Sequence, residues 1–278
     1  TNYTLTKKDA LLKNGQVTLK FLPRIKHGDL QFGNGYAERA KLIGRYFRAE
    51  FASLKAEIEQ PKYFREKLIY NYIYKGPLLE WYMRIKTSME KNYKTFCELV
   101  PQQGKILDIG CGYGFMAYML SFTSAQRKIT GLDYDEEKID TANNCFSKTN
   151  NINFVHGDVM GFEFEQYDAI IVADMLHYLP PAEQKQVIEK CISNLNPGGK
   201  LIIRDGDADK EAMHKKTKLT EFFSTKLFNF NKTKETGLSF LSGTMIRNLA
   251  AEKNMDCSEM PDSKHTSNTL FILKARAN

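Results

Sequence analysis

Three glycines and an acidic residue lie together near the middle of the chain, between an apolar stretch and a predicted helix. Asp108 is followed by Gly110, Gly112 and Gly114 at alternate positions. Glycines allow a tight turn and the close approach of a ligand to main-chain atoms, and the start of the following helix offers free N–H groups. The pattern therefore predicts a ligand site. Because Phe115 stands where a dinucleotide site has its third glycine, a NAD-dependent dehydrogenase is disfavoured.

Two further acidic residues follow the next two stretches that predict strands. Asp133 ends the second stretch, and a carboxylate there can accept both hydroxyls of a ribose. Tyr134, the next residue, can cover the face of an adenine ring. Asp158 and Val159 follow the third stretch, where a carboxylate can accept the amino group of adenine. These residues predict a site for a ligand that contains a nucleoside.

Three residues near the ends of the fourth and fifth predicted strands are candidates for proton transfer. Asp174 and His177 follow the fourth strand, and Asp205 follows the fifth. A base is needed at this place only if the group to be modified is a hydroxyl or a phenol. Packing or loop anchoring by His177, and a turn at Asp205, are alternatives that the residues leave open.

Short apolar stretches alternate with helical patterns from residue 105 onward. Strands are expected at 105–109, 128–133, 152–155, 168–173 and 200–204, and helices at 115–122, 136–147 and 182–195. This alternation predicts a parallel sheet with helices on both faces. A helix at 242–253 and strands at 256–260 and 268–274 follow, and these two strands are expected to form an antiparallel edge hairpin. The expected fold class is α/β: a Rossmann-like, doubly wound, mostly parallel seven-stranded sheet.

The residues before this domain divide into two expected regions. Residues 1–60 contain a strand-like alternation at 16–22 and an amphipathic linker helix at 37–58. Residues 61–100 predict a helical extension, whose last helix is expected at 78–100 after a Gly-Pro break. The α/β domain itself is expected to occupy residues 101–278, with a long polar and aromatic insertion at residues 206–241.

The composition is that of a globular protein. Hydrophobic residues make up 42% of the 278 residues and charged residues 26%. No run of apolar residues is long enough to predict a membrane-spanning helix, and no secretory signal is recognised in the first thirty residues. The five cysteines include no C-x-x-C pair, so neither a disulfide framework nor a metal site is expected.

The net charge of +7 is unevenly distributed, with a basic first hundred residues and an acidic middle. A basic flank can attract nucleic acid, an anionic membrane surface or an acidic substrate, and solvated lysine-rich helix faces explain it equally well. The expected location is the cytoplasm, and contact with the inner face of the membrane is left open. The sequence carries no strong nucleic-acid signal.

In order and spacing, five segments of the chain resemble the class I S-adenosylmethionine-dependent methyltransferases. The segments are ILDIGCGYG (106–114), ITGLDYD (129–135), HGDV (156–159), YDAIIVADMLHYL (167–179) and LNPGGKLIIRD (195–205). The resemblance implies S-adenosylmethionine as cofactor, with its methionine part held by the first loop, including Cys111. It further implies that Asp133 holds the ribose and Asp158 the adenine. Asp174 and His177 would then line the point of methyl transfer.

The same resemblance bears on the segments before and after these motifs. In that family an N-terminal segment often folds over the cofactor, so residues 61–100 are expected to form a lid in which Tyr74 and Lys75 reach it. The insertion at 206–241 lies at the usual place of a substrate cap, and its aromatic part is 220–230. Ordinary hydrophobic packing is the alternative for both segments.

From about residue 47 onward the chain is also similar to the C-terminal methyltransferase part of bacterial proteins that fuse an exporter-like region, an acyltransferase and a methyltransferase. The similar segments are RYFRAEF (45–51), YIYKGPLLEWYMRIK (72–86), CGYGFMAYMLSF (111–122) and LTEFFSTKLFNFNKT (219–233). Residues 15–25 resemble the end of the acyltransferase part, although this chain has no His-x4-Asp motif. The likeness implies a small aromatic or lipid-like acceptor in aryl-polyene or flexirubin-type pigment or lipid biosynthesis. It also implies acyltransferase and exporter parts of a longer polypeptide as partners.

Two other functions stay open. The basic flank suits methylation of RNA or protein, although residues 173–176 read Ala-Asp-Met-Leu and not Asn-Pro-Pro-Tyr, which argues against methylation of a base amine. A domain that binds the cofactor without turnover, and serves as an interaction module, is the remaining alternative.

Overall fold

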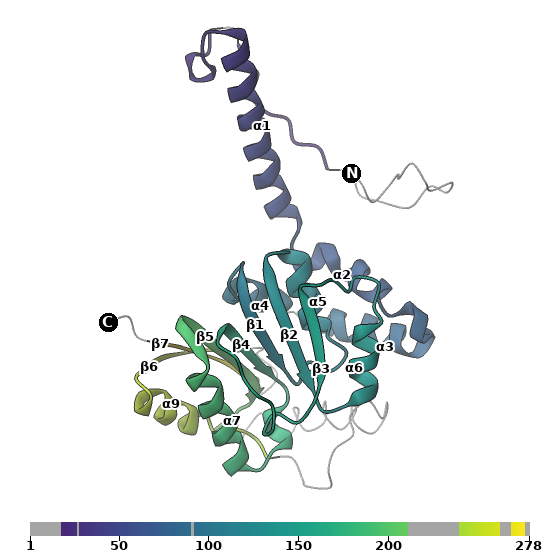
Figure 1. Ribbon diagram of the computed structural model, residues 1–278, viewed down its shortest axis with the longest axis vertical. Coiled ribbons are helices and arrows are strands. Elements are labelled where there is room, and N and C mark those ends of the chain that lie inside the picture. Colours follow the sequence, from purple (N-terminus) through teal and green to yellow (C-terminus); the bar gives the residue numbers. More distant parts are fainter. Residues whose placement is uncertain (1–17, 27, 90–91, 211–238, 262–267, 276–278) are drawn as a thin grey trace. The chain divides into compact units, whose positions relative to one another are not determined.

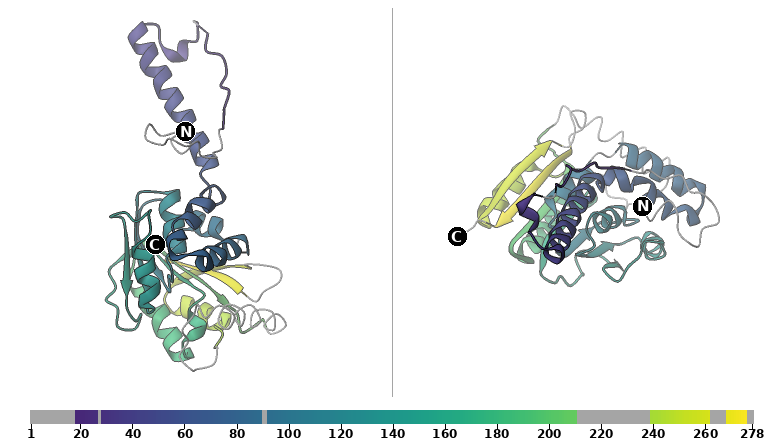
Figure 2. Two further views of the ribbon diagram at one scale, coloured as in Figure 1. Left: turned by 90° about the vertical axis from the view of Figure 1, so that its right-hand side faces the viewer. Right: turned by 90° about the horizontal axis from the view of Figure 1, so that it is seen from above.

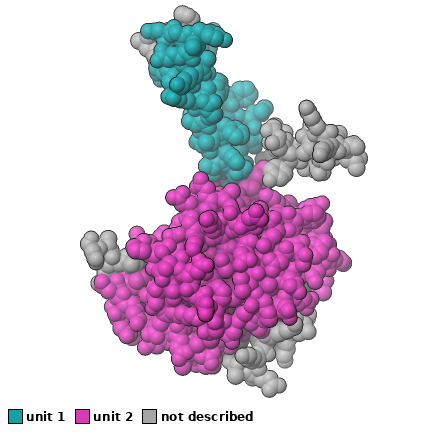
Figure 3. All heavy atoms as spheres, in the orientation of Figure 1, with its two compact units in different colours: residues 1–59 teal, residues 60–278 magenta. Residues whose placement is uncertain are grey.

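The computed structural model describes residues 18–26, 28–89, 92–210, 239–261 and 268–275. The chain forms two compact units, residues 1–59 and residues 60–278 (Figure 3). The aromatic segment 220–230, and most of the insertion expected at 206–241, lie outside the described residues. No helix in the described part of the chain is long and apolar enough to cross a bilayer.

The first unit is built on one long helix, α1 (Tyr36–Ile58), which buries none of its residues. A short 3-10 helix, η1 (Leu30–Phe32), precedes it, and the Phe32 ring meets the Tyr46 ring edge-on at 5.5 Å. The strand expected at 16–22 is wrong, because residues 18–26 adopt no regular structure. An alternating stretch becomes a strand only beside another strand that accepts and donates its backbone hydrogen bonds, and the described part of this unit contains none.

The second unit contains a seven-stranded sheet in the order β3-β2-β1-β4-β5-β7-β6. Its strands are β1 (Gly104–Ile109), β2 (Arg127–Asp133), β3 (Ile152–His156), β4 (Tyr167–Ala173), β5 (Leu195–Gly206), β6 (Met255–Pro261) and β7 (Asn268–Ala275). β1 to β5 pair in parallel, whereas β7 is antiparallel to both β5 and β6. The expected fold class and antiparallel edge hairpin are therefore confirmed.

Helices cover both faces of this sheet (Figures 1 and 2). They are α2 (Pro61–Tyr70), η2 (Ile73–Lys75), α3 (Pro77–Met89), α4 (Tyr93–Leu99), α5 (Phe115–Thr123), α6 (Glu136–Asn143), η3 (Leu176–Tyr178), α7 (Pro181–Ser193) and α9 (Gly243–Glu252). Consecutive strand residues point to opposite faces, so Ile106 joins a core with α2 to α6, while Leu107 joins a second core with α7 and α9.

The single helix expected at 78–100 is wrong, because α3 ends at Met89 and α4 begins at Tyr93. A straight helix over that range would be about 34 Å long. The break allows Met83 of α3 and Phe96 of α4, both fully buried, to pack into one core cluster.

Candidate functional site

The five parallel strands bring their carboxyl ends, and the turns that follow them, to one edge of the sheet (Figure 1). In doubly wound sheets, ligands bind beyond this edge, where neighbouring connections leave in opposite directions. Here the switch lies between β1 and β4, which are adjacent in the sheet. The residues selected from the sequence in these turns therefore share one edge.

The turn after β1 is fixed by backbone geometry that requires glycine. Gly110, Gly112 and Gly114 have φ angles of 72°, 53° and 76°, in the left-handed region that favours glycine. A Cβ on Gly114 would lie 2.4 Å from the Phe154 ring, so only glycine fits. The turn is tied to the end of β2, because the Gly110 and Cys111 N–H groups donate to the Leu132 carbonyl at 2.8 and 3.1 Å.

Asp108, the acid before the glycines, is 3% exposed. Burial, followed by the nearby Asp133 carboxylate, raises the pKa of Asp108 to about 7. Its Oδ2 atom is buried without a hydrogen-bond partner. A buried carboxylate oxygen that accepts no hydrogen bond, at the ligand edge of the sheet, suits a cationic donor. The ammonium group of the methionine part of S-adenosylmethionine is such a donor.

Asp133 closes the turn from the other side. Its Oδ2 accepts a hydrogen bond from Gly112 N at 2.7 Å, and its Oδ1 accepts one from Asp135 N at 2.9 Å. Tyr134 beside it is half-exposed, and burial together with Asp133 raises its pKa. Both oxygens of Asp133 are thus oriented by the backbone, and each retains a lone pair for a further donor such as a ribose hydroxyl.

The acid after β3 lies on a turn at the same edge. Asp158 is exposed, and its Oδ1 accepts a hydrogen bond from Met160 N at 2.9 Å. Val159 is buried and belongs to the core cluster on the α7 face of the sheet. Asp158 is therefore exposed to solvent, while the adjacent Val159 packs into the core and holds the chain there.

Tyr74 and Lys75, which the sequence places in an expected lid, have different surroundings. The Tyr74 hydroxyl donates to the Thr141 carbonyl of α6 at 2.7 Å, and burial raises its pKa to about 12, while Lys75 is exposed. Tyr72, which the sequence reasoning passed over, is fully buried and donates to the Tyr113 carbonyl within the glycine turn at 2.7 Å. The sequence feature that could have pointed to Tyr72 is the presence of tyrosines at alternate positions 70, 72 and 74.

A histidine and an aspartate pair at the ends of β4 and β5. His177 Nδ1 lies 2.6 Å from Asp205 Oδ1, and both side chains are buried. Asp205 also accepts hydrogen bonds from Gly206 N at 2.7 Å and His177 N at 3.3 Å. An ionised carboxylate only accepts hydrogen bonds, so beside an ionised Asp205 the proton would lie on Nδ1 and Nε2 would be the basic nitrogen. The rings of Tyr178 and Phe240 lie 4.1 and 6.2 Å from the imidazole.

Asp174 forms a second bridge between these strands. Its φ angle is 54°, and its N–H donates to the Arg204 carbonyl at 2.8 Å. Its carboxylate pairs with the Arg204 guanidinium, another residue that the sequence reasoning had left out of the site. The Arg204 guanidinium is therefore an electrostatic partner of the Asp174 carboxylate.

Residues 106–199, which contain the glycine turn, most of β1 and the whole of β2 to β4, match a family model described as a methyltransferase domain. This part of the chain is therefore similar to methyltransferase domains. Two curated proteins are similar over part of the chain, and the match spans less than half of each of them. Carboxy-S-adenosyl-L-methionine synthase of Campylobacter fetus is 28% identical over 102 residues, which cover 36% of this chain and 44% of that protein. Ubiquinone biosynthesis O-methyltransferase of Shewanella halifaxensis is 32% identical over 99 residues, covering 34% and 40%.

Solved structures of methyltransferases share the fold of this domain. Human N-acetylserotonin methyltransferase in complex with S-adenosylmethionine is similar at a TM-score of 0.53 and 19% identity, over 74% of this chain and 58% of that one. Magnesium protoporphyrin IX methyltransferase of Synechocystis PCC 6803 is similar at 0.51 and 15% identity, over 69% and 82%. At these identities the likeness shows that the chain shares their fold.

The methyltransferase domain also holds a buried lysine that sequence reasoning did not select. Lys138 is 8% exposed, with its ammonium 4.0 Å from Asp135 Oδ2 and 5.8 Å from the centre of the Tyr113 ring. Burial lowers the pKa of Lys138, while Asp133 and Asp135 act in the opposite direction. The sequence feature that could have pointed to Lys138 is its position on α6, five residues after Asp133 at the end of β2.

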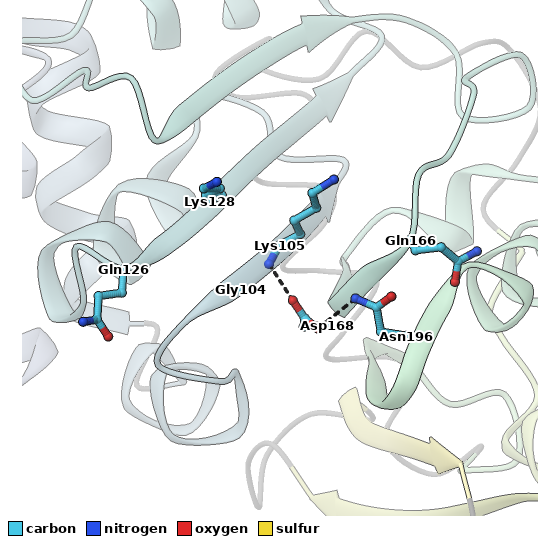
Figure 4. Close-up of a pocket in the computed structure, with 7 residues that line it drawn as sticks. All are labelled: Gly104, Lys105, Gln126, Lys128, Gln166, Asp168 and Asn196. Carbon is cyan, nitrogen blue, oxygen red and sulfur yellow. Dashed lines mark hydrogen bonds between the residues drawn. The ribbon is translucent and has the colours of Figure 1, made fainter.

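A shallow hollow of about 350 Å³ lies at the opposite edge of the methyltransferase domain, where the strands begin (Figure 4). Asp168 in its wall accepts hydrogen bonds from Lys105 N at 2.7 Å and Asn196 Nδ2 at 2.8 Å. The Lys105 ammonium pairs with Glu165 at 2.5 Å. These polar groups satisfy one another and join the beginnings of β1, β4 and β5, so the hollow is explained by the fold.

Proposed function

We propose that this chain is an S-adenosylmethionine-dependent methyltransferase that methylates a hydroxyl of a small aromatic or lipid-like acceptor. The observation that carries the acceptor class is the buried His177–Asp205 pair at the end of β4 and β5, beside the cofactor turns. A hydroxyl is a poor nucleophile until its proton is removed, and this pair is built to accept a proton. The resemblance to fusion proteins of pigment and lipid gene sets supports an aromatic or acyl-chain acceptor.

The cofactor would be held by three acids and the glycine turn. Asp108 Oδ2 would accept a hydrogen bond from the ammonium group of the methionine part, Asp133 would accept hydrogen bonds from the ribose hydroxyls, and Asp158 would accept one from the adenine amino group. When bound, S-adenosylmethionine supplies an activated methyl group on a sulfonium sulfur. Holding the acceptor oxygen in line with that methyl carbon can contribute about 7–11 kcal/mol to lowering the barrier.

His177 acts on the acceptor and Asp205 acts on His177. His177 Nε2 would take the proton of the acceptor hydroxyl, so that its oxygen can receive the methyl group that the cofactor would supply. Asp205 keeps the Nδ1 proton in place and stabilises the imidazolium that forms. The Phe240 and Tyr178 rings beside the imidazole limit the access of water.

The test combines binding with turnover. Calorimetry with S-adenosylhomocysteine is expected to give micromolar binding to the native chain and none to Asp133→Ala. With methyl-labelled cofactor and a panel of phenols, catechols and hydroxylated fatty acids, at least one acceptor is expected to be labelled. His177→Gln should bind S-adenosylhomocysteine as the native chain does but turn over roughly a hundredfold or more slowly.

Each part of the result bears on a different part of the proposal. A native chain that does not bind S-adenosylhomocysteine contradicts the cofactor. Binding without turnover on any acceptor leaves a domain that holds the cofactor as an interaction module. Unchanged turnover in His177→Gln removes the base and with it the argument for a hydroxyl acceptor.

The relative from Campylobacter fetus favours a second candidate, in which the chain produces or uses a carboxylated form of the cofactor. Mass spectrometry of the small molecule that remains bound to the purified protein separates the two candidates. S-adenosylmethionine or S-adenosylhomocysteine supports the methyltransferase, and a carboxylated cofactor supports the second candidate.

A further inference from the structure

The segment between β3 and β4, residues 157–166, starts at the ligand edge of the sheet and has no helix or strand of its own. Asp158 is its second residue, and the first turn of the segment closes on it. Gly161 N and Phe162 N donate to the Asp158 carbonyl at 3.1 and 2.9 Å, and Met160 N donates to Asp158 Oδ1 at 2.9 Å. The direction of the Asp158 carboxylate therefore depends on the position of this whole turn.

A lysine from α7 anchors the turn. Lys190 Nζ donates to the carbonyls of Val159 at 3.1 Å, Met160 at 3.0 Å and Phe162 at 2.6 Å. An ammonium group has three donors, so these carbonyls account for all of them. The same ammonium lies 4.7 Å from the centre of the Phe164 ring, which adds a cation–π contact.

The apolar residues of the segment pack against the core, but they provide no hydrogen-bond donor for its backbone carbonyls. Val159 is buried, and the Phe162 and Phe164 rings meet at 5.4 Å while packing against the core cluster on the α7 face. Backbone carbonyls beside an apolar cluster are costly without a donor. Lys190 supplies a donor to each of three of these carbonyls, and thereby fixes the turn in one arrangement.

We propose that Lys190 is a positioning residue that holds Asp158 for the adenine amino group and so sets the preference of the site for adenine. The proposal rests on the function proposed above. A carboxylate attracts the amino group at C6 of adenine and repels the oxygen at C6 of hypoxanthine. This discrimination requires a carboxylate held in place by supporting contacts, because a mobile one can turn away from the oxygen.

The experiment compares two ligands that differ at this atom. Calorimetry with S-adenosylhomocysteine and S-inosylhomocysteine is carried out on the native chain and on Lys190→Met, which keeps the length of the side chain and removes its donors. The variant is expected to bind S-adenosylhomocysteine roughly tenfold more weakly and to lose most of the native preference over the inosine analogue. At saturating cofactor, kcat should be unchanged while KM for the cofactor rises.

Two further variants keep the result interpretable. Lys185→Met, on the same helix, removes an exposed lysine that pairs at 4.0 Å with Glu189, and both its affinity and its preference should stay native. Lys190→Gln keeps a single donor site and should give an intermediate preference if Lys190→Met is too unstable to measure. Hydrogen exchange at Gly161 and Phe162 should accelerate in both Lys190 variants, with β1 and β4 still protected.

The outcomes separate this inference from the function on which it rests. A native chain that binds neither ligand overturns the proposed function and this inference together. A native chain that prefers the adenine ligand, with Lys190 variants that keep the same preference, overturns the positioning role alone. A merely structural role would lower stability in these variants without changing the ratio of the two affinities.

Discussion

At the residue scale, Asp108 is a buried carboxyl group with one oxygen that accepts no hydrogen bond. The carboxyl group is buried beside Asp133, and its Oδ2 has no partner in the protein. Such a group is costly for the folded chain unless it holds its proton or meets a cation. The site thus contains an acceptor whose natural partner is a positively charged ligand.

The first prediction concerns the pH dependence that Asp108 imposes on stability. Its pKa is about 7 in the folded chain against an ordinary value of 3.8, so the folded state binds the proton more tightly than the unfolded state. Stability is therefore lost as the pH rises between those values, by up to about 1.4 kcal/mol per pH unit. Urea unfolding of the native chain and of Asp108→Asn should give a difference with this slope.

The matched control for this measurement is Asp140→Asn, at an exposed position on α6. Its free energy of unfolding should differ from the native value by a nearly constant amount across the same pH range. A native chain and Asp108→Asn with parallel pH profiles would show that Asp108 is not the group responsible.

At the element scale, one arginine joins two helices to the sheet. Arg127, the first residue of β2, is fully buried, and burial lowers its pKa. Its guanidinium donates to the carbonyls of Cys97, Val100, Pro101 and Leu120 and to the Thr123 hydroxyl, at distances of 2.7 to 3.0 Å. These acceptors lie at the carboxyl ends of α4 and α5, where the partial negative charge of a helix favours a cation.

The prediction at this scale is that Arg127→Lys destabilises the domain strongly. An ammonium group cannot reach acceptors on two helices and a loop at once, so at least two buried carbonyls would lose their donors. The expected cost is about 2–4 kcal/mol in the free energy of unfolding, measured with urea. The neighbouring exposed Lys128→Arg should change it by less than about 0.5 kcal/mol. Equal effects of the two changes would contradict this account of Arg127.

At the scale of the whole molecule, stability is concentrated in the second unit. Both core clusters consist of residues from Phe64 onward, and α1 buries none of its residues. Hydrophobic burial is the dominant favourable term in folding. Residues 60–278 therefore contain what a cooperative fold requires.

The corresponding prediction is that a chain beginning at Gln60 unfolds at the same urea midpoint as the full chain, and as cooperatively. Its affinity for S-adenosylhomocysteine should also be unchanged, because every acid assigned to the cofactor lies in the second unit. A lower midpoint or a broadened transition would instead show that the first unit contributes to the stability of the domain.

The sequence by itself determined the features that depend on local pattern. The glycine turn could be predicted because the left-handed backbone at Gly110, Gly112 and Gly114 excludes other residues. The alternation of apolar strands and helices predicted the sheet because the strands are buried on both faces. The same reasoning failed at residues 16–22, where a strand-like alternation has no neighbouring strand among the described residues of its unit.

Only the tertiary structure decided which of these residues meet. His177 and Asp205 are 28 positions apart and pair because β4 lies beside β5, an order that hydrophobic periodicity does not encode. The contacts of Lys190 with the turn after β3, and of Arg127 with two helix ends, likewise join segments that are distant in the chain. Such contacts depend on sheet order and helix placement, which follow from burial of the whole chain and not from the spacing of any one segment.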